Sequence, residues 1–296
     1  MALGAGTLAW SLIEAQWFAL RHARVPVLPT GSAEVRLLHI SDLHLVPRQR
    51  RKIAWVRSLA ELRPDLVINT GDNMAHEHSL PAVLTALEPL LDFPGAFVMG
   101  SNDYYSPVWK NPARYLRPRA PGVPTGRAPT LPGAELGRAL VSAGWRDMGN
   151  TRAQLVTGGT EFSLVGVDDP HLDRDDFPAP DPGGGTQAPA VHLGLTHAPY
   201  QRVLAAMRSD GVDLTLAGHT HGGQVCLPGY GALVTNCDLD TGRGSGLHGW
   251  PGARPTAGDQ DSMWLHVSAG LGTSPFTPVR FACRPEATLL TLTAAK

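Results

Sequence analysis

Five polar clusters rich in histidine, aspartate and asparagine each follow a short apolar run. They are Ser41-Asp42-Leu43-His44, Thr70-Gly71-Asp72-Asn73, Gly100-Ser101-Asn102-Asp103, Thr196-His197 and Gly218-His219-Thr220-His221-Gly222-Gly223-Gln224. Imidazole nitrogens suit zinc and iron, and carboxylate oxygens suit manganese and other hard ions. Together they supply enough ligands for two ions, and a pair of ions activates a water and holds a phosphate group.

The spacing inside the clusters favours a metal site. Asp42 and His44 alternate along what the sequence predicts to be an extended segment, so both side chains face one side. His219 and His221 have the same spacing. A single Asp-x-His is common by chance, but the ordered series D-x-H, G-D, T-H and G-H-T-H is specific. We therefore predict a metal centre.

The apolar runs before the clusters are predicted strands of an α/β protein. They are Val35–Ile40, Leu66–Asn69, Ala96–Met99, Val191–Leu195 and Leu214–Ala217. Helical spacing at Lys52–Leu62 and Ser79–Leu91 separates the first three, and Ser79 is a candidate helix cap with Pro81 in the first turn. This β-α-β-α-β order indicates a parallel half-sheet. Its strands end at the edge where open α/β sheets bind ligands, so we expect the clusters to converge.

The rest of the chain predicts further elements and three loops. Helices are expected at Ala134–Ala143 and Tyr200–Ser209, and strands at Gln154–Thr157, Phe162–Val167, Val225–Leu227, Ala232–Thr235, Trp264–Val267, Val279–Cys283 and Thr288–Leu292. The late strands have no helices between them, which indicates antiparallel or mixed pairing. Residues 104–132 are rich in proline and arginine and predict an inserted loop or lid. Asp169–Ala188 and Asp238–Asp261 are expected to be surface loops.

Composition limits the classes of function. The chain has 296 residues, 43% of them hydrophobic, and 25 basic residues balance 26 acidic ones. A net charge of −1 argues against binding nucleic acid by phosphate neutralisation, so no nucleic-acid partner is expected. Three cysteines favour a reducing compartment, with a Cys226–Cys237 bridge as the alternative.

The N-terminus is apolar over Met1–Ile13, and positive charge follows this run rather than preceding it as in a secretory signal. Thirteen residues are fewer than the roughly 20 that cross a bilayer. Three interpretations remain: a helix packed on the domain, a shallow membrane anchor with Trp10, Trp17 and Phe18 at the interface, or the remnant of a longer span. We divide the chain into an N-terminal segment, 1–34, and a catalytic domain, 35–296, located in the cytoplasm or peripherally at the cytoplasmic membrane.

The motifs D-L-H, T-G-D-N, G-S-N-D, T-H-A-P and G-H-T-H-G-G-Q resemble those of the calcineurin-like metallophosphoesterases, from about Val35 to the C-terminus. The chain looks most similar to the bacterial, membrane-associated branch of that family. The resemblance implies an α/β fold, a two-sheet β-sandwich flanked by helices. It also implies a hydrolase of phosphoric esters that uses a hydroxide bridging two divalent ions of manganese, iron or zinc.

The resemblance also implies a ligand set. Asp42, His44 and His221 would hold the first ion, and Asp72 would bridge both ions. His197 and His219 would hold the second ion together with an asparagine of the third motif. His197 and His219 would in addition neutralise negative charge that develops on the phosphate during the reaction.

The third motif departs from the family pattern, Gly-Asn-His followed by Asp or Glu. Aligned on Gly100 and Asp103, it places Ser101 at the asparagine ligand position and Asn102 at the histidine position. Alternatively the loop is shifted by one residue and Asn102 itself is the ligand, which we prefer because an amide oxygen binds metal better than a neutral hydroxyl. Asn102 at the histidine position can donate a hydrogen bond but not a proton. Asp103 would then be the acid, if its pKa is raised.

Three further residues are predicted to contact substrate, each with a structural alternative. His76 follows Asp72 and also fits a solvated helix entrance. Arg50 lies in the basic run of residues 48–52, which fits an anionic substrate, anionic lipid headgroups or a solvated face. Tyr104 could stack on a base or sugar, or pack in the core. Asp168 and Asp169 precede Pro170 and are interpreted as turn residues.

The leading functional hypothesis is a dinuclear phosphodiesterase. A lipid-linked nucleotide pyrophosphate of the UDP-2,3-diacylglucosamine type is the second candidate substrate, suggested by the N-terminus and by relatives. The hypothesis from another class is a catalytically weak metal-binding module at the membrane, suggested by the altered third motif. Turnover of a chromogenic phosphodiester with Mn²⁺ separates the enzyme from the module.

Overall fold

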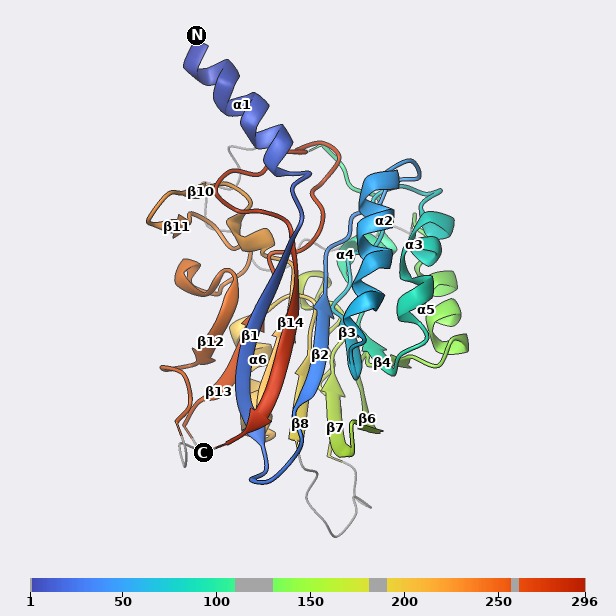
Figure 1. Ribbon diagram of the computed structural model, residues 1–296, viewed down its shortest axis with the longest axis vertical. Helices are drawn as coiled ribbons and strands as arrows, with labels where there is room; N and C mark the ends of the chain where they lie inside the picture. Colours follow the sequence, from blue (N-terminus) through green and yellow to red (C-terminus); the bar gives the residue numbers. More distant parts are fainter. Residues whose placement is uncertain (1, 110–129, 181–190, 257–260, 296) are drawn as a thin grey trace.

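A computed structural model describes residues 2–109, 130–180, 191–256 and 261–295. Two six-stranded mixed sheets lie face to face, and helices cover their outer faces (Figure 1). The expected α/β sandwich is thereby confirmed. Part of the predicted lid, residues 110–129, and parts of the two predicted loops, residues 181–190 and 257–260, lie outside the described residues.

The first sheet has the order β1-β14-β2-β3-β4-β5. Its strands are β1 (Ala19–Leu28), β14 (Glu286–Ala294), β2 (Val35–Ile40), β3 (Leu66–Asn69), β4 (Gly95–Phe97) and β5 (Arg146–Asp147). β2, β3 and β4 pair in parallel. Their connections contain α2 (Arg50–Ser58) with a 3-10 turn at Leu59–Leu62, and α3 (Leu80–Leu87) with a 3-10 turn at Glu88–Leu90. The β-α-β-α-β prediction is confirmed.

The second sheet has the order β12-β13-β9-β8-β7-β6. Its strands are β12 (Gly246–Trp250), β13 (Met263–Val267), β9 (Leu214–Ala217), β8 (Val191–Leu195), β7 (Thr160–Gly166) and β6 (Thr151–Thr157). β7, β8, β9 and β13 are parallel neighbours, whereas both edge strands pair antiparallel, so the expected mixed pairing is confirmed. A hairpin of β10 (Cys226–Leu227) and β11 (Gly231–Ala232) follows β9.

Three apolar layers hold the sandwich together. The central layer lies between the sheets and includes Leu37, Ile68, Leu193 and Leu216. A second layer packs the first sheet against α2, α3 and α5 (Gly133–Ser142), and a third packs the second sheet against α6 (Gln201–Ser209). The inner strands are covered on both faces, which explains why they read as continuous apolar runs.

Three local predictions were wrong. Val279–Cys283 is a loop rather than a strand, because the Arg280 side chain turns inward to a group of backbone carbonyls. The region expected as a Gly-rich surface loop contains β12, which pairs with β13 along its whole length. Ser79 lies at the N-cap of α3, but its hydroxyl donates to the carbonyl of Leu45 instead of capping the helix.

The N-terminal segment contributes to the fold. β1, which was not predicted, pairs with β14 in parallel and forms one edge of the first sheet, so the sheet begins at Ala19. α1 (Ala2–Glu14) precedes it and projects from the end of the sandwich (Figure 1). Ser11 and Glu14 are buried at its base, and residues 4–10 are exposed. No helix among the described residues has the length and apolarity needed to span a membrane.

Candidate metal centre

The five polar clusters follow β2, β3, β4, β8 and β9, at the carboxyl ends of parallel strands in both sheets. These five strands end on the same side of the sandwich, the side that carries α1 (Figure 1). Side chains from the clusters line a cavity of about 390 Å³. The predicted convergence of segments as far apart as Asp42 and His221 is confirmed.

The backbone at the clusters is not extended, as the sequence argument assumed. Asp42, His44, Asp72, His219 and His221 all have positive φ, between 40° and 67°. Each such residue costs about 1–3 kcal/mol and persists only where its surroundings enforce it. Tight left-handed turns, rather than the alternation of a strand, therefore aim these side chains at one point.

Two glycines allow the turns to approach one another. A Cβ on Gly100 would lie 2.3 Å from Asp72 Oδ1, and one on Gly218 would lie 2.0 Å from Ser41 Oγ. Any other residue at either position would displace the carboxylates of the centre. Gly100 after β4 and Gly218 after β9 are therefore required because a larger residue would clash with the neighbouring turn.

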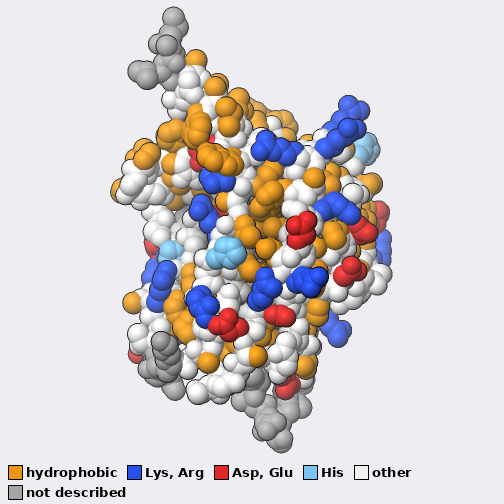
Figure 2. Space-filling view, viewed as in Figure 1, with side chains coloured by type: hydrophobic (Ala, Val, Ile, Leu, Met, Phe, Trp, Pro, Cys, Tyr) orange, Lys and Arg blue, Asp and Glu red, His pale blue; other side chains and the backbone are white. Residues whose placement is uncertain are grey.

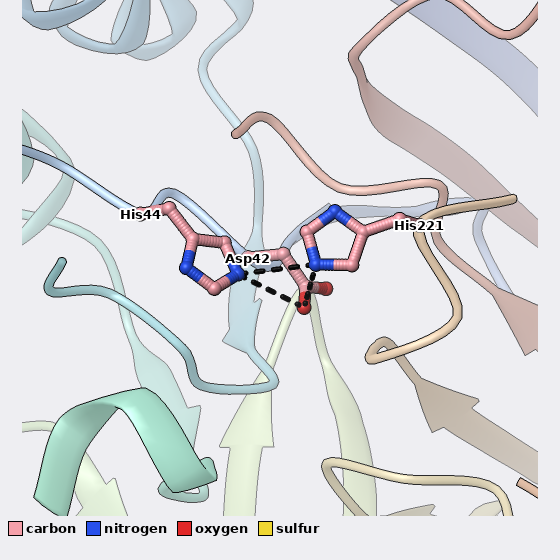
Figure 3. Close-up of side chains that lie close together, drawn as sticks. All are labelled: Asp42, His44 and His221. Atoms are coloured by element: carbon pink, nitrogen blue, oxygen red, sulfur yellow. Dashed lines mark hydrogen bonds and ion pairs between the residues drawn. The ribbon is translucent and has the colours of Figure 1, made fainter. Parts of the chain in front are cut away.

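Asp42, His44 and His221 form the first ligand group (Figure 3). The Nε2 atoms of the two imidazoles are 3.1 Å apart, and Asp42 Oδ1 lies 3.5 Å from His221 Nε2 and 3.9 Å from His44 Nε2. Burial lowers the pKa of His44 to about 4 and that of His221 well below its ordinary value. Two neutral imidazoles whose nitrogens converge with a carboxylate are suited to a divalent cation.

Asp42, Asp72 and His197 form the second ligand group. Asp72 Oδ1 lies 3.5 Å from His197 Nε2, and its Oδ2 lies 3.3 Å from His44 Nε2. The carboxylate of Asp72 thus reaches both groups. His219 Nδ1 lies 3.3 Å from His197 Nε2, beside the second group. The two groups share carboxylates, as a dinuclear centre requires.

Hydrogen bonds select the nitrogen that each histidine turns to the centre. His197 Nδ1 donates to the Thr70 carbonyl at 2.7 Å, which leaves Nε2 as the ligand atom. His219 Nε2 contacts the Asn236 carbonyl at 3.2 Å, so Nδ1 faces the centre. His221 Nδ1 contacts the Gly272 carbonyl at 3.2 Å, so Nε2 faces the centre. These contacts orient the three imidazole rings without help from a ligand.

A buried relay of hydrogen bonds holds Asp42. Ser41 Oγ donates to Asp42 Oδ2 at 2.6 Å, and Thr70 Oγ1 donates to Ser41 Oγ at 2.7 Å. His39 Nε2 lies 2.9 Å from Thr70 Oγ1, and His39 Nδ1 lies 2.8 Å from His266 Nδ1. Burial lowers the pKa of His266 to about 3, so both imidazoles are neutral and the donor direction is unique, from His266 to Asp42. Burial raises the pKa of Asp42 to about 6, and the hydrogen bond from Ser41 acts against this shift, so the relay favours the ionised carboxylate and holds it in one orientation.

The third motif supports Asp72 from two sides. The Asn102 backbone N–H donates to Asp72 Oδ1 at 2.7 Å, and Asn102 Nδ2 donates to Asp72 Oδ2 at 2.8 Å. Asp103 accepts the backbone N–H groups of Gly100, Asp72 and Asn73. Asp103 is fully buried, and it is not among the described residues that line the cavity, whereas Ser101 and Asn102 are. Burial raises the pKa of Asp103 to about 6, as the predicted role as acid requires, but its oxygens accept backbone N–H groups, which fits a positioning role.

Asn102→Ala is expected to reduce the metal content of the protein from two ions towards one. The substitution removes the amide that contacts Asp72 and the amide oxygen that can ligate the second ion, while the Asn102 backbone N–H contact stays. Elemental analysis of the purified protein checks the result. Ser101→Ala is the matched comparison, and a loss of metal in that variant alone would make Ser101 the ligand instead.

The three predicted substrate residues are outside the described lining of the cavity. His76 is exposed and contacts His78, and Arg50 is exposed at the start of α2. Tyr104 donates to Asp168 Oδ1 at 2.8 Å, beneath the guanidinium of Arg174. The surroundings of His76 therefore fit a solvated helix entrance, and those of Tyr104 fit packing in the core, better than they fit substrate contact.

The sequence argument missed His171, which lines the cavity and packs on His219 with ring centroids 4.3 Å apart. His171 lies in the 3-10 turn Pro170–Leu172, whose N-cap, Asp169, accepts the His171 backbone N–H. The interpretation of Asp169 as a turn residue is confirmed. The 3-10 turn brings the imidazole of His171 to the second ligand group. The sequence pattern of polar clusters after strands did not predict this residue.

Arg280 was also missed. Its side chain is fully buried, and Nη2 donates to the carbonyls of Ala269 and Gly272, each at 2.7 Å. Nη1 donates to the carbonyl of His221 at 3.0 Å. Since these short contacts use both hydrogens of Nη2, the Nδ1 of His221 keeps its own hydrogen for the Gly272 carbonyl. Arg280 thus fixes the turn that carries His221.

Charge couples Asp72 and His197. Burial alone would raise the pKa of Asp72, but the charge of His197 and hydrogen bonds from His197 and Asn102 hold it well below its ordinary value. Burial alone would lower the pKa of His197, but the charge of Asp72 raises it well above its ordinary value. A proton on His197 Nε2 competes with a metal ion, so acidification weakens metal binding.

The fold and the centre together define a class of protein. A family model of the calcineurin-like phosphoesterases matches residues 35–223, more than half of the chain. The chain therefore belongs to the calcineurin-like phosphoesterase family and is a metal-dependent phosphoesterase.

Comparison with individual proteins adds two relatives and one solved structure that aligns with this chain. Phosphodiesterase YaeI of Escherichia coli (strain K12) is 27% identical over 285 residues, which cover 94% of this chain and 90% of that protein. An uncharacterized metallophosphoesterase of Aquifex aeolicus (strain VF5) is 28% identical over 272 residues, covering 90% and 87%. Among solved structures, TT1561 of Thermus thermophilus aligns with a TM-score of 0.41 and 14% identity, covering 81% of this chain and 91% of that one.

Proposed function

We propose that this protein hydrolyses phosphodiesters at a dinuclear metal centre. The observation that carries the proposal is Asp72, whose two carboxylate oxygens reach His44 of the first ligand group and His197 of the second. The name of the YaeI relative, a phosphodiesterase, agrees with this substrate class. The mixed nitrogen and oxygen ligands suit manganese, iron or zinc, and we propose Mn²⁺ for the assay because carboxylates contribute to both groups.

The side chains of the centre would have different roles. Asp42, His44 and His221 would hold one ion, His197 and His219 with Asn102 would hold the other, and Asp72 would bridge them. Two such ions, when bound, activate a water and neutralise charge on the phosphate. The imidazole of His171 lies beside His219 on the cavity wall and would face a phosphodiester bound in the cavity. Asp103 keeps the Asp72 turn in place.

Metal content and turnover together test the proposal. We expect two ions per chain after loading with Mn²⁺ at pH 8, fewer at pH 6, and hydrolysis of bis-p-nitrophenyl phosphate that ends on chelation and returns with Mn²⁺. The pH difference follows from the raised pKa of His197. One ion or none, without turnover after Mn²⁺ addition, would favour the metal-binding module instead.

We also propose the membrane-associated branch of the family and a peripheral location at the cytoplasmic membrane. α1 supports this proposal because its apolar residues Leu8, Leu12 and Ile13 are between 44% and 59% exposed. A surface helix that lies on lipid keeps such residues exposed in the absence of lipid. A lipid-linked pyrophosphate remains the second candidate substrate, and the same surface supports it.

A further inference from the structure

The mouth of the metal cavity is rimmed by apolar side chains that solvent reaches. We define the apolar rim as Val108, Val225, Leu227, Leu233 and Phe276, which are between 45% and 51% exposed. Val108, Val225, Leu233 and Phe276 line the cavity itself, together with Asp72 and histidines of the candidate metal centre. Such a contiguous exposed apolar patch on a monomer marks a binding surface.

The β10–β11 hairpin carries apolar side chains on its outward face, where an ordinary surface hairpin carries polar ones. Cys226 and Ala232 face inward and are 6% and 7% exposed. Val225, Leu227 and Leu233 occupy the alternate positions that face outward, where a solvated hairpin carries polar residues. The outward face of the hairpin is therefore built to meet an apolar medium.

α1 and the apolar rim belong to one rigid surface. Glu14 accepts the backbone N–H groups of Ala282 and Cys283, at 3.1 and 2.7 Å, and so fixes the base of α1 to the loop after Arg280. The same loop pairs with the hairpin, because the Cys226 N–H donates to the Phe281 carbonyl at 2.9 Å. Figure 2 shows hydrophobic side chains gathered over α1 and the β10–β11 hairpin.

Exposed hydrophobic side chains are concentrated on this surface. In the described part of the chain, the large ones are Leu8, Trp10, Leu12, Ile13 and Trp17 on or just after α1; Val108, Trp109, Val225, Leu227, Tyr230, Leu233 and Phe276 at or beside the apolar rim; and Val141 and Val156 elsewhere. The exposed arginines Arg48, Arg50 and Arg51 follow the first motif, and α2 begins at the same end of the molecule (Figure 1). An apolar face with tryptophans and neighbouring arginines fits an anionic lipid surface.

We propose that the apolar rim docks on anionic phospholipid together with α1, and that the substrate is an amphiphile whose apolar chain lies along the rim while its phosphodiester enters the metal cavity. The proposal rests on the phosphodiesterase function and deepens it. A phosphodiester in a lipid layer lies just beneath the headgroup surface. A cavity that opens within the docking face can therefore reach it while the apolar chain of the substrate stays close to the lipid.

Vesicle binding tests the docking step. The metal-loaded full chain should co-sediment with vesicles of phosphatidylcholine and phosphatidylglycerol and less with phosphatidylcholine alone. L227S/L233S is expected to weaken partitioning about tenfold or more, because two side chains lose their burial in lipid. V141S/V156S, which changes two exposed valines away from the surface, is the matched control and should partition as the unaltered protein does. Equal binding by both double variants, or no binding by the unaltered protein, would overturn the proposal.

Two substrates that share a leaving group and differ in their alkyl chain test the contact between that chain and the apolar rim. p-Nitrophenyl hexadecyl phosphate and p-nitrophenyl ethyl phosphate are compared in the same neutral detergent micelles with Mn²⁺. We expect kcat/KM to be about tenfold or more higher for the hexadecyl ester, and this ratio to fall towards one in L233S/F276S but not in V141S/V156S. Hydrolysis of both esters with a ratio near one in the unaltered protein would overturn the amphiphile proposal alone. Failure to hydrolyse either ester would overturn the phosphodiesterase function itself. Self-association through the rim, seen by light scattering without vesicle binding, would assign the surface to a second copy instead.

Discussion

Asp72→Asn is expected to lower kcat/KM for a phosphodiester by about 10³-fold or more, equivalent to about 4 kcal/mol of transition-state stabilisation. Asp72 is the carboxylate that reaches both ligand groups, with oxygens 3.3 Å from His44 Nε2 and 3.5 Å from His197 Nε2. An amide in its place carries no charge and presents one oxygen, so it cannot bridge two cations. The bound metal should fall below two ions per chain in the same variant.

The substitution keeps the backbone conformation of residue 72, although the new amide group loses one of the two hydrogen bonds that Asp72 accepts from Asn102. Asp72 has a φ of 56°, and asparagine accepts this left-handed conformation as readily as aspartate does. Asp173→Asn is the matched control, since Asp173 has a φ of 54° and ion-pairs on the surface with Arg202. We expect the control to keep two ions and its turnover. If D72N keeps two ions and more than about a tenth of the turnover, the bridging assignment is wrong.

Arg280→Met is expected to destabilise the protein by about 3–5 kcal/mol and to remove metal from the first ligand group. The guanidinium is fully buried and donates to the carbonyls of Ala269, Gly272 and His221 at 2.7–3.0 Å. Each buried acceptor that loses its donor costs about 1–3 kcal/mol. The His221 turn, with its φ of 51°, then loses the contact that enforces it.

Urea unfolding and metal analysis check this prediction separately. The midpoint of unfolding should fall with little change in slope, which reports lost stability rather than a changed denatured state. The urea midpoint of Arg280→Lys should lie between those of Arg280→Met and the unaltered protein, because an ammonium group cannot span the same set of carbonyls. Arg284→Met is the control on the same loop, since Arg284 donates to the carbonyls of Trp17 and Phe18, in the connection between α1 and β1. Equal losses in the Arg280 and Arg284 variants would remove the special role of Arg280.

Much of the site could be read from the sequence because its parts are local. Each cluster directly follows a strand, and the strands Val35–Ile40, Val191–Leu195 and Leu214–Ala217 begin and end where the apolar runs do. Parallel strands bring their carboxyl ends to one edge, so residues 177 positions apart, such as His44 and His221, were expected to meet. One of the elements that sequence patterning misplaced, Val279–Cys283, has an arginine among apolar residues, a pattern that also fits a short strand.

The sequence alone determined the residue types, the β-α-β-α-β order of the half-sheet and the edge at which the metal ligands gather, because these depend on short-range pattern and on the geometry of parallel sheets. Tertiary structure decided which atoms face the centre and what holds them. Glu14 and Cys283 meet across 269 residues, and His39 and His266 across 227. Left-handed turns at Asp42, Asp72 and His221, and the apolar side chains around the cavity, likewise depend on packing between segments. No local pattern encodes a contact whose partner lies in another sheet.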